Sequence, residues 1–246
     1  GALYRGFFID DCHDIVRLED VHLYPFWDFA LSPLKDFTAE HGEGFIIART
    51  DWQQMTNCFC IGYKTGFHFI HSPKREPYDP GPGDVKIVGG GADGGGAAVL
   101  VDSTMATMGV SFVNCQFYGE INVSASNTGP VKFTACTLAG SMNGTNGVRF
   151  GRLSGEGPVS FSNCHFRAID PRCAHAPAGL VAEGGRLTVT GCLFQDTQPA
   201  QIVLEPAVKA AILTSNQFAG ANAIDNRAEG QVAIGLNLEG VALSPE

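Results

Sequence analysis

The stretch Val110-Ser111-Phe112-Val113-Asn114-Cys115-Gln116-Phe117 decides the fold class. Its apolar side chains occupy even-numbered positions up to Phe112 and odd-numbered positions from Cys115 onward. Alternation of this kind is typical of a β-strand that buries one face. The change of phase at Asn114 predicts a sharp bend between two short strands.

The same pattern recurs along the chain. Its shared form is apolar-x-apolar-x-small-Cys-x-apolar, and the clear copies are Val131–Leu138, Val159–Phe166, Leu187–Phe194 and Ala211–Phe218. Looser copies are Leu18–Leu23, Met55–Cys60 and Val232–Leu238. The cysteine column is Cys115, Cys136, Cys164 and Cys192, followed by Asn216, so the repeats are spaced by 21, 28, 28 and 24 residues. Repeats of this length predict a solenoid, here with eight or nine coils.

An Asn-Cys pair stands at the bend in three of these copies, at Asn57, Asn114 and Asn163. Asn tolerates the left-handed backbone conformation that a sharp corner requires. The pattern resembles the right-handed parallel β-helix of the pectate-lyase-like superfamily. This resemblance implies an all-β, single-stranded, right-handed parallel β-helix in which equivalent inward side chains stack from coil to coil.

The repeats indicate one β-helix domain over residues 1–246. Strand-like sequence starts at once, in Gly1–Ile9, and no polar or helical segment precedes it to cover the first coil. We therefore expect this chain to lack the N-terminal cap of the solenoid and to be the C-terminal part of a longer protein. Helix signals are poor, because no window shows a sustained helical apolar face with caps.

The formal net charge of −9 argues against a nucleic-acid partner, which would require clustered Lys and Arg. No apolar run reaches 18 residues, so we expect no membrane partner. No signal peptide is visible in this chain. The resemblance implies an extracellular or periplasmic location.

The eight cysteines are not spaced as a zinc site, and the sequence predicts no metal centre. The four cysteines of the column should be reduced and stacked inside the solenoid, where free Cys behaves as a small apolar residue. Cys12, Cys60 and Cys173 lie outside that column, and their redox state is left open.

Residues 43–72 hold most of the groups that could do chemistry. Within them, Phe67-His68-Phe69 alternates, which directs His68 out of the sheet. The combination of Arg49-x-Asp51-Trp52 with a Gly62-Tyr63-x-x-Gly66 coil is similar to bacterial β-helix proteins that are grouped with glycoside hydrolases. A second group, Trp27 beside Asp28, lies in an aromatic loop that follows Pro25.

The resemblance implies a polysaccharide or oligosaccharide partner, and the best hypothesis is a glycoside hydrolase that uses paired carboxylates without a cofactor. We predict Glu43 and Asp51 as the catalytic carboxylates, with Asp28 as an alternate. The predicted substrate-binding residues are Arg49, Lys64 and His68, which would orient the sugar, and Trp27, Trp52 and Tyr63, which would stack on it. The polygalacturonase and pectate-lyase signatures do not match, so no catalytic residue is transferred from those families.

Three alternatives remain open. The chain could be a polysaccharide lyase that uses Lys64, Arg49 or His68 as its base, with Ca²⁺ to neutralise a uronate carboxylate. It could be a non-catalytic carbohydrate-binding or tailspike-like module, which would form a homo-oligomer, typically a trimer. It could also carry an incomplete site, with partner carboxylates in N-terminal coils that precede this sequence.

Overall fold

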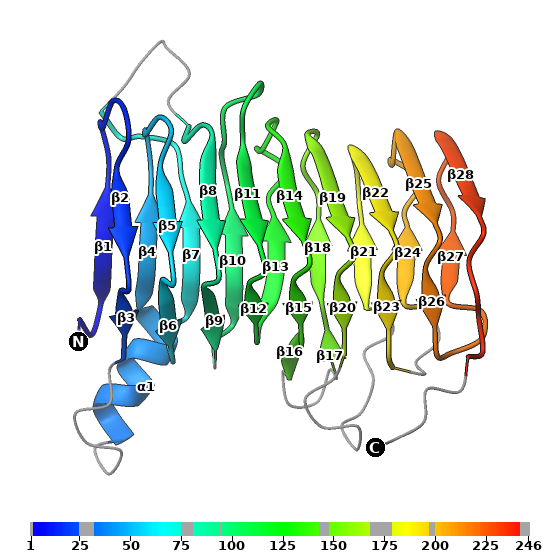
Figure 1. Ribbon diagram of the computed structural model, residues 1–246, viewed down its shortest axis with the longest axis horizontal. Coiled ribbons are helices and arrows are strands. Elements are labelled where there is room, and N and C mark those ends of the chain that lie inside the picture. Colours follow the sequence, from blue (N-terminus) through cyan, green and yellow to red (C-terminus); the bar gives the residue numbers. More distant parts are fainter. Residues whose placement is uncertain are drawn as a thin grey trace.

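Each turn of the chain contributes one strand to each of three parallel sheets, except that the last turn has no strand in the third, so the molecule is a parallel β-helix (Figure 1). The computed structural model describes residues 2–24, 32–74, 81–93, 95–142, 148–167, 179–196 and 200–241. The strands follow the same order in space as in sequence in all three sheets. The predicted fold class is confirmed, with nine coils.

Sheets 1 and 2 are the two long walls of the solenoid, and each has nine strands. Sheet 1 consists of β1 (Arg5–Ile9), β4 (Glu43–Ile47), β7 (Thr65–Phe69), β10 (Ala97–Val101), β13 (Glu120–Val123), β18 (Gly151–Leu153), β21 (Leu180–Ala182), β24 (Ile202–Leu204) and β27 (Ile224–Asn226). Sheet 2 consists of β2 (Arg17–Glu19), β5 (Gln54–Thr56), β8 (Val85–Val88), β11 (Val110–Val113), β14 (Val131–Thr134), β19 (Pro158–Ser162), β22 (Arg186–Thr190), β25 (Ala210–Thr214) and β28 (Gln231–Gly235).

Sheet 3 is the narrow wall, and its eight strands are only two or three residues long. They are β3 (His22–Leu23), β6 (Phe59–Ile61), β9 (Gly91–Asp93), β12 (Gln116–Phe117), β15 (Thr137–Leu138), β20 (His165–Phe166), β23 (Leu193–Phe194) and β26 (Gln217–Phe218). A small antiparallel pair, β16 (Ser141–Met142) and β17 (Val148–Arg149), lies on an excursion between β15 and β18.

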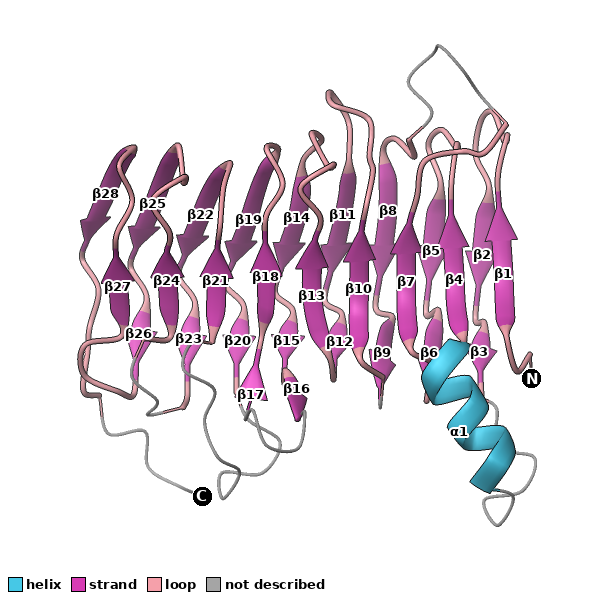
Figure 2. Cartoon of the chain, turned by 180° about the vertical axis from the view of Figure 1, so that it is seen from behind, coloured by secondary structure: helices cyan, strands magenta, loops and turns pink. Residues whose placement is uncertain are grey.

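The winding is right-handed. In Figure 2 the chain rises along sheet 1 in front and descends along sheet 2 behind, and each successive coil lies further to the left. This is the handedness that parallel strand crossovers adopt in nearly all sheets.

A left-handed residue separates sheet 2 from sheet 3 in every coil. The residues with positive φ at this corner are Asp20, Asn57, Gly89, Asn114, Ala135, Asn163, Gly191, Ser215 and Leu236. Their φ values lie between 52° and 66°. The bend predicted from the change of phase at Asn114 is therefore confirmed and recurs in all nine coils.

The residue after each bend points into the solenoid. Cys58, Cys115, Cys136, Cys164 and Cys192 occupy this position, are buried, and are free thiols. Hydrogen bonds to neighbouring thiols, together with burial, raise the pKa of Cys115 and Cys164 above the ordinary value. The prediction of a reduced, stacked cysteine column is confirmed. Cys12 and Cys60 are also free, whereas Cys173 lies outside the described residues.

Phenylalanine rings form parallel stacks beside the thiols. In sheet 2, the ring of Phe133 lies 4.9 Å from the rings of both Phe112 and Phe161. In sheet 1, the rings of Phe45 and Phe67 are 5.0 Å apart. Stacking of equivalent inward side chains from coil to coil, which the resemblance implies, is therefore present in both long walls.

Within the described residues one helix, α1 (Ser32–His41), interrupts the solenoid between β3 and β4, although helix signals in the sequence are poor. Its docking rests on Thr38, which is fully buried and donates to the carbonyl of Leu3 at 2.9 Å. Leu34 and Phe37 remain exposed, so the helix has no continuous apolar stripe. A search for helical periodicity misses such a helix, although Pro33 in its first turn and Gly42 just after it are ordinary boundary residues.

Candidate functional site

The outward face of sheet 1 carries a row of interacting polar side chains. In β7, Phe67 and Phe69 point inward and are fully buried, so His68 between them points outward, as predicted. Its neighbours in the sheet are Ile46 on one side and Leu100 on the other. The fold therefore does not require an ionisable group at this position.

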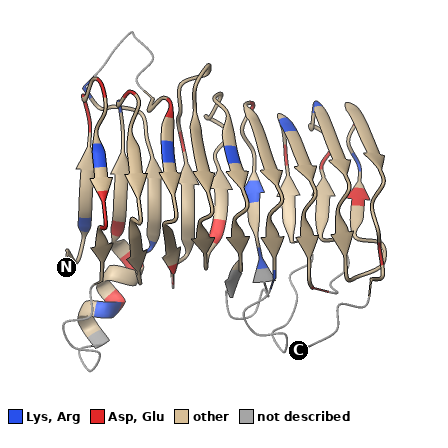
Figure 3. Ribbon diagram, viewed as in Figure 1, with Lys and Arg blue, Asp and Glu red and all other residues tan. Residues whose placement is uncertain are grey.

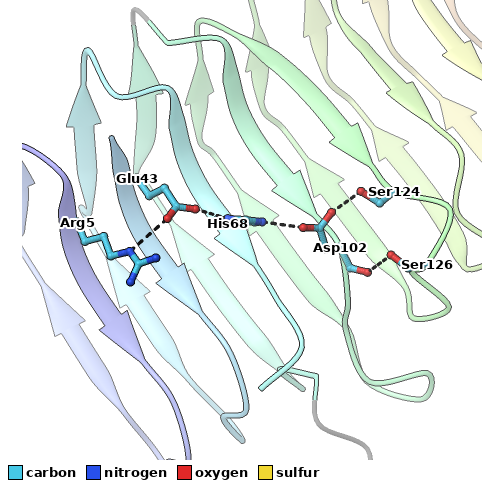
Figure 4. Close-up of polar contacts among 6 residues, drawn as sticks. All are labelled: Arg5, Glu43, His68, Asp102, Ser124 and Ser126. Atoms are coloured by element: carbon cyan, nitrogen blue, oxygen red, sulfur yellow. Dashed lines mark hydrogen bonds and ion pairs between the residues drawn. The ribbon is translucent and has the colours of Figure 1, made fainter. Parts of the chain in front are cut away.

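His68 lies between two carboxylates from adjacent coils (Figure 4). Its Nδ1 is 2.5 Å from Oε1 of Glu43, the first residue of β4. Its Nε2 is 2.8 Å from Oδ2 of Asp102, which directly follows β10. Because ionised carboxylates only accept hydrogen bonds, this geometry favours an imidazolium that donates from both nitrogens.

The electrostatics agree with this protonation state. Burial alone would lower the pKa of His68, but the hydrogen bonds to Asp102 and Glu43 outweigh it, and the pKa is raised. The hydrogen bond from His68 lowers the pKa of Asp102 against the opposing effect of burial, and Ser124 adds to the lowering. We call these three groups the Glu43–His68–Asp102 array, in which the geometry favours a protonated imidazole between two hydrogen-bond acceptors.

The array is extended at both ends. Nε of Arg5, in β1, lies 3.5 Å from Oε2 of Glu43. The hydroxyl of Ser124 donates to Oδ1 of Asp102, and that of Ser126 donates to the backbone carbonyl of Asp102 at 2.7 Å. Figure 4 shows these groups as one line of contacts that crosses five successive coils. Stacking of coils is what brings residues so far apart in sequence into contact.

A depression of about 240 Å³ gives solvent access to one side of the array. Its lining residues are Arg5, Phe8, Glu43, Ile46, His68, Ile70 and Pro73. The Asp102 side chain is 40% exposed, whereas those of His68 and Glu43 are 16% and 19% exposed. A ligand on this face would therefore reach the Asp102 carboxylate most easily.

Glu43 and Asp51, the predicted carboxylate pair, lie at opposite ends of β4. Asp51 lies in the corner after β4, where it pairs with Gly83, and the length of β4 alone corresponds to about 13 Å of extended chain. Glu43 therefore faces Asp102 across His68 and not Asp51. Arg49 lies in the same corner as Asp51, and its backbone N–H donates to Oδ1 of Asp10.

The predicted sugar-stacking residues fall in different environments. Trp52 is 47% exposed at the corner that leads into sheet 2, with Nζ of Lys86 5.8 Å from the centre of its ring. Tyr63 is fully buried and its hydroxyl donates to the carbonyl of Ala2, so its ring is not available to a ligand, which corrects that prediction. Lys64 is exposed just before β7. Trp27 and Asp28 lie outside the described residues.

Comparison with protein-family models, curated proteins and solved structures gave no match to this chain. Within the described part of the chain, no three His, Cys, Asp or Glu side chains group as ligands for a metal ion. No helix among the same residues is long and apolar enough to cross a membrane.

Proposed function

We propose that this protein is a polysaccharide-processing β-helix protein, related to the pectate-lyase-like superfamily, and that it acts as a glycoside hydrolase through Glu43 and Asp102. The observation that carries the proposal is the Glu43–His68–Asp102 array on the outward face of sheet 1, beside an open depression. Hydrolysis of a glycosidic bond needs one carboxyl group that donates a proton and a second that acts on the opposite side of the sugar.

The environments of the two carboxylates suggest their roles. Asp102 is the more exposed and has a lowered pKa, which suits the base that removes a proton from the attacking water. Glu43 is more shielded and can take a proton from Nδ1 of His68, which suits the donor to the leaving oxygen. After one turnover Asp102 holds the water proton. Asp102 then releases that proton to solvent and Nδ1 of His68 regains one from solvent, so the cycle closes without a net gain or loss of protons.

The spacing favours inversion of the anomeric configuration. The two carboxylates bind opposite nitrogens of one imidazole ring, so they cannot approach to the roughly 5–5.5 Å that retaining enzymes use. The wider separation corresponds better to the roughly 6.5–9.5 Å of inverting enzymes. Following the product anomer by NMR would test this assignment.

The test is a screen of the purified chain against plant, algal and bacterial polysaccharides, recording new reducing ends and the absorbance of unsaturated uronates. We expect reducing ends without that absorbance. Glu43→Gln and Asp102→Asn should each lower the rate by about a thousandfold or more, because each removes a reacting carboxyl group. Glu205→Gln, which alters an ion-paired carboxylate on the same face, is the matched control and should retain the wild-type rate.

Two other results would redirect the proposal. Unsaturated products would indicate a polysaccharide lyase, with exposed Lys64 as the first base to test. Binding without any product would indicate a carbohydrate-binding or tailspike-like module. Full activity in both Glu43→Gln and Asp102→Asn would contradict the assigned carboxylates.

A further inference from the structure

A second depression lies further along the outward face of sheet 1. Its volume is about 340 Å³, and it spans the coils that contain β13 and β18. The lining residues are Glu120, Asn122, Val123, Ser124, Arg149, Arg152 and Ser154. All but Val123 are polar or charged, so the depression suits a hydrated, hydrogen-bonding ligand.

The local backbone explains how two arginines reach this depression. Phe150 is fully buried, whereas Arg152 in the middle of β18 is exposed. Gly151 sits against the preceding coil, where a Cβ would lie only 2.1 Å from the carbonyl oxygen of Ile121. The close approach permitted by this glycine lets the chain leave the β16–β17 excursion and enter sheet 1 with Arg149 and Arg152 both lining the depression.

The two guanidinium groups differ in their partners. Nε of Arg152 is 3.3 Å from Oε1 of Glu183, whose other oxygen accepts a hydrogen bond from Ser154 at 2.6 Å. The carboxylate of Glu120 accepts a hydrogen bond from the Asn122 amide at 3.3 Å. Arg149 makes no ion pair or side-chain hydrogen bond with any described residue, and it is partly buried. Among the described residues, the Arg149 guanidinium group therefore has no carboxylate partner, although the protein as a whole carries a net charge of −9 and Glu120 lines the same depression.

A guanidinium group binds planar or tetrahedral oxyanions through two parallel hydrogen bonds, which favours carboxylates and sulfates over neutral groups. The hydroxyl and amide groups of Asn122, Ser124 and Ser154 suit the hydroxyls of a sugar ring. Ser124 also donates to Asp102, so the depression adjoins the Glu43–His68–Asp102 array directly. Adjacent coils are about 4.8 Å apart, a spacing similar to that of neighbouring sugar residues in an extended polymer.

We propose that Arg149 and Arg152 form a subsite for an anionic sugar residue, carboxylated or sulfated, of a polysaccharide that lies across the coils of sheet 1. The subsite would hold the sugar beside the one bound at Asp102. This substrate class deepens the proposed hydrolase function and rests on it only for the claim that the bound polymer is cleaved.

Binding measured by affinity electrophoresis and calorimetry tests the subsite without turnover. The probes are polygalacturonate for carboxylates, dextran sulfate for sulfates and dextran as the neutral polymer. We expect at least one anionic probe to bind about tenfold or more tightly than dextran. Arg149→Gln should remove most of that difference, and Arg149→Lys should restore part of it. Preference for one anionic probe would identify the anion.

Two control variants separate a built subsite from general attraction of a polyanion. Arg227→Gln removes an ion-paired arginine directly after β27 of the same sheet, and Lys132→Gln removes a cation from the exposed face of sheet 2. Both should bind the anionic probes within about twofold of wild type. Unchanged melting temperatures would show that all the variants are folded.

Equal binding of dextran and the anionic probes would overturn the subsite. Equal losses in Arg149→Gln and the two controls would also overturn it. Cleavage of neutral polymers alone, insensitive to Arg149, would reject the subsite while leaving the hydrolase proposal intact. Arg149-dependent binding of an anionic probe without cleavage of any polymer would support the subsite and reject the hydrolase.

Discussion

Sheets 1 and 2 are built from the same nine coils, yet their outer faces differ in chemistry. Both pair in parallel, and both bury columns of large apolar side chains. On sheet 2, one aligned outward row carries hydroxyl groups in Ser111, Ser160 and Thr188, with Lys86 and Lys132 among them, and its one ion pair joins Lys86 to the adjacent Asp84 among the described residues. On sheet 1, the outward groups contact one another as ions, and Figure 3 shows acidic and basic residues of the chain interspersed along the coils.

The difference separates what the fold requires from what it merely permits. Side chains at inward positions on either sheet must fill the interior of the solenoid, so their residue types indicate the fold and not the function. Outward positions can hold any side chain that tolerates a strand, as the serines and threonines of sheet 2 demonstrate. Ionisable groups that contact one another on sheet 1 are therefore better evidence of function than the repeat itself.

We expect the largest effects from substitutions in the buried aromatic stacks of sheets 1 and 2, which should contribute equally to stability. Phe133→Ala in sheet 2 and Phe67→Ala in sheet 1 should each lower the free energy of unfolding by about 3–5 kcal/mol, because each leaves a cavity in an aromatic stack. Urea unfolding followed by circular dichroism measures this. Lys132→Ala, next to Phe133 but outward, should change it by less than about 0.5 kcal/mol. A small loss in only one of the two Phe variants would show that the walls are not equivalent.

The outer faces of the two sheets should also differ in how much one outward substitution destabilises the protein. His68→Gln should lower the free energy of unfolding by about 2 kcal/mol at pH 6, because it removes the cation that separates Glu43 from Asp102. Ser160→Ala, an outward change in sheet 2, should stay within about 0.5 kcal/mol. Equal stability of both variants would remove the claimed distinction between the faces.

The stabilisation by His68 should depend on pH with a definite window. The raised pKa of His68 makes its contribution complete below its unfolded-state value of about 6.5, and the contribution is lost as the pH rises through the folded-state value. The lowered pKa of Asp102 makes its contribution complete above about pH 4, and it is lost as the pH falls through the folded-state value. The difference between wild type and His68→Gln should therefore be greatest between about pH 4 and 6.5. A flat difference from pH 3 to 9, measured by urea titration, would contradict the ionised array.

The smallest predicted effect lies at the bend that all coils share. Ala135 has a φ of 53°, which costs an L-residue with no compensating polar group about 1–2 kcal/mol. Ala135→Gly should raise the free energy of unfolding by about 0.5–1 kcal/mol once the greater flexibility of Gly in the unfolded chain is counted. Asn163→Ala, at the equivalent bend, should lower it by about 1 kcal/mol, and thermal denaturation can compare the two. The same sign for both changes would mean that φ does not decide the effect.

The fold could be predicted because the shift of the apolar positions at each bend can be seen within a few consecutive residues. Asn114 and Asn163, each followed by a cysteine, predict a corner from the local sequence alone. The helix escaped prediction because a single buried residue, Thr38, anchors it. Tyr63 was assigned to a ligand because it stands among polar residues, but the packing of coils against α1 and the N-terminus encloses it.

The candidate site could be predicted only in part. Glu43 and the outward direction of His68 followed from position and alternation. Asp102 did not, because it lies 34 residues beyond His68 and the sequence does not reveal the register between their two coils. Arg5 and Ser124 were missed for the same reason. In a solenoid, contacts between coils depend on the register of each turn, and variable corners hide that register from the sequence.

The cysteine column gives this protein an internal set of unfolding reporters. Cys58, Cys115, Cys136, Cys164 and Cys192 occupy equivalent places in five different coils, and each is shielded from solvent. Under native conditions a thiol reagent can modify each one only when its own coil opens. Mass spectrometry of pulse-labelled protein would therefore read the opening free energy coil by coil. The native cysteines alone would then show whether the coils unfold one after another from one end or cooperatively.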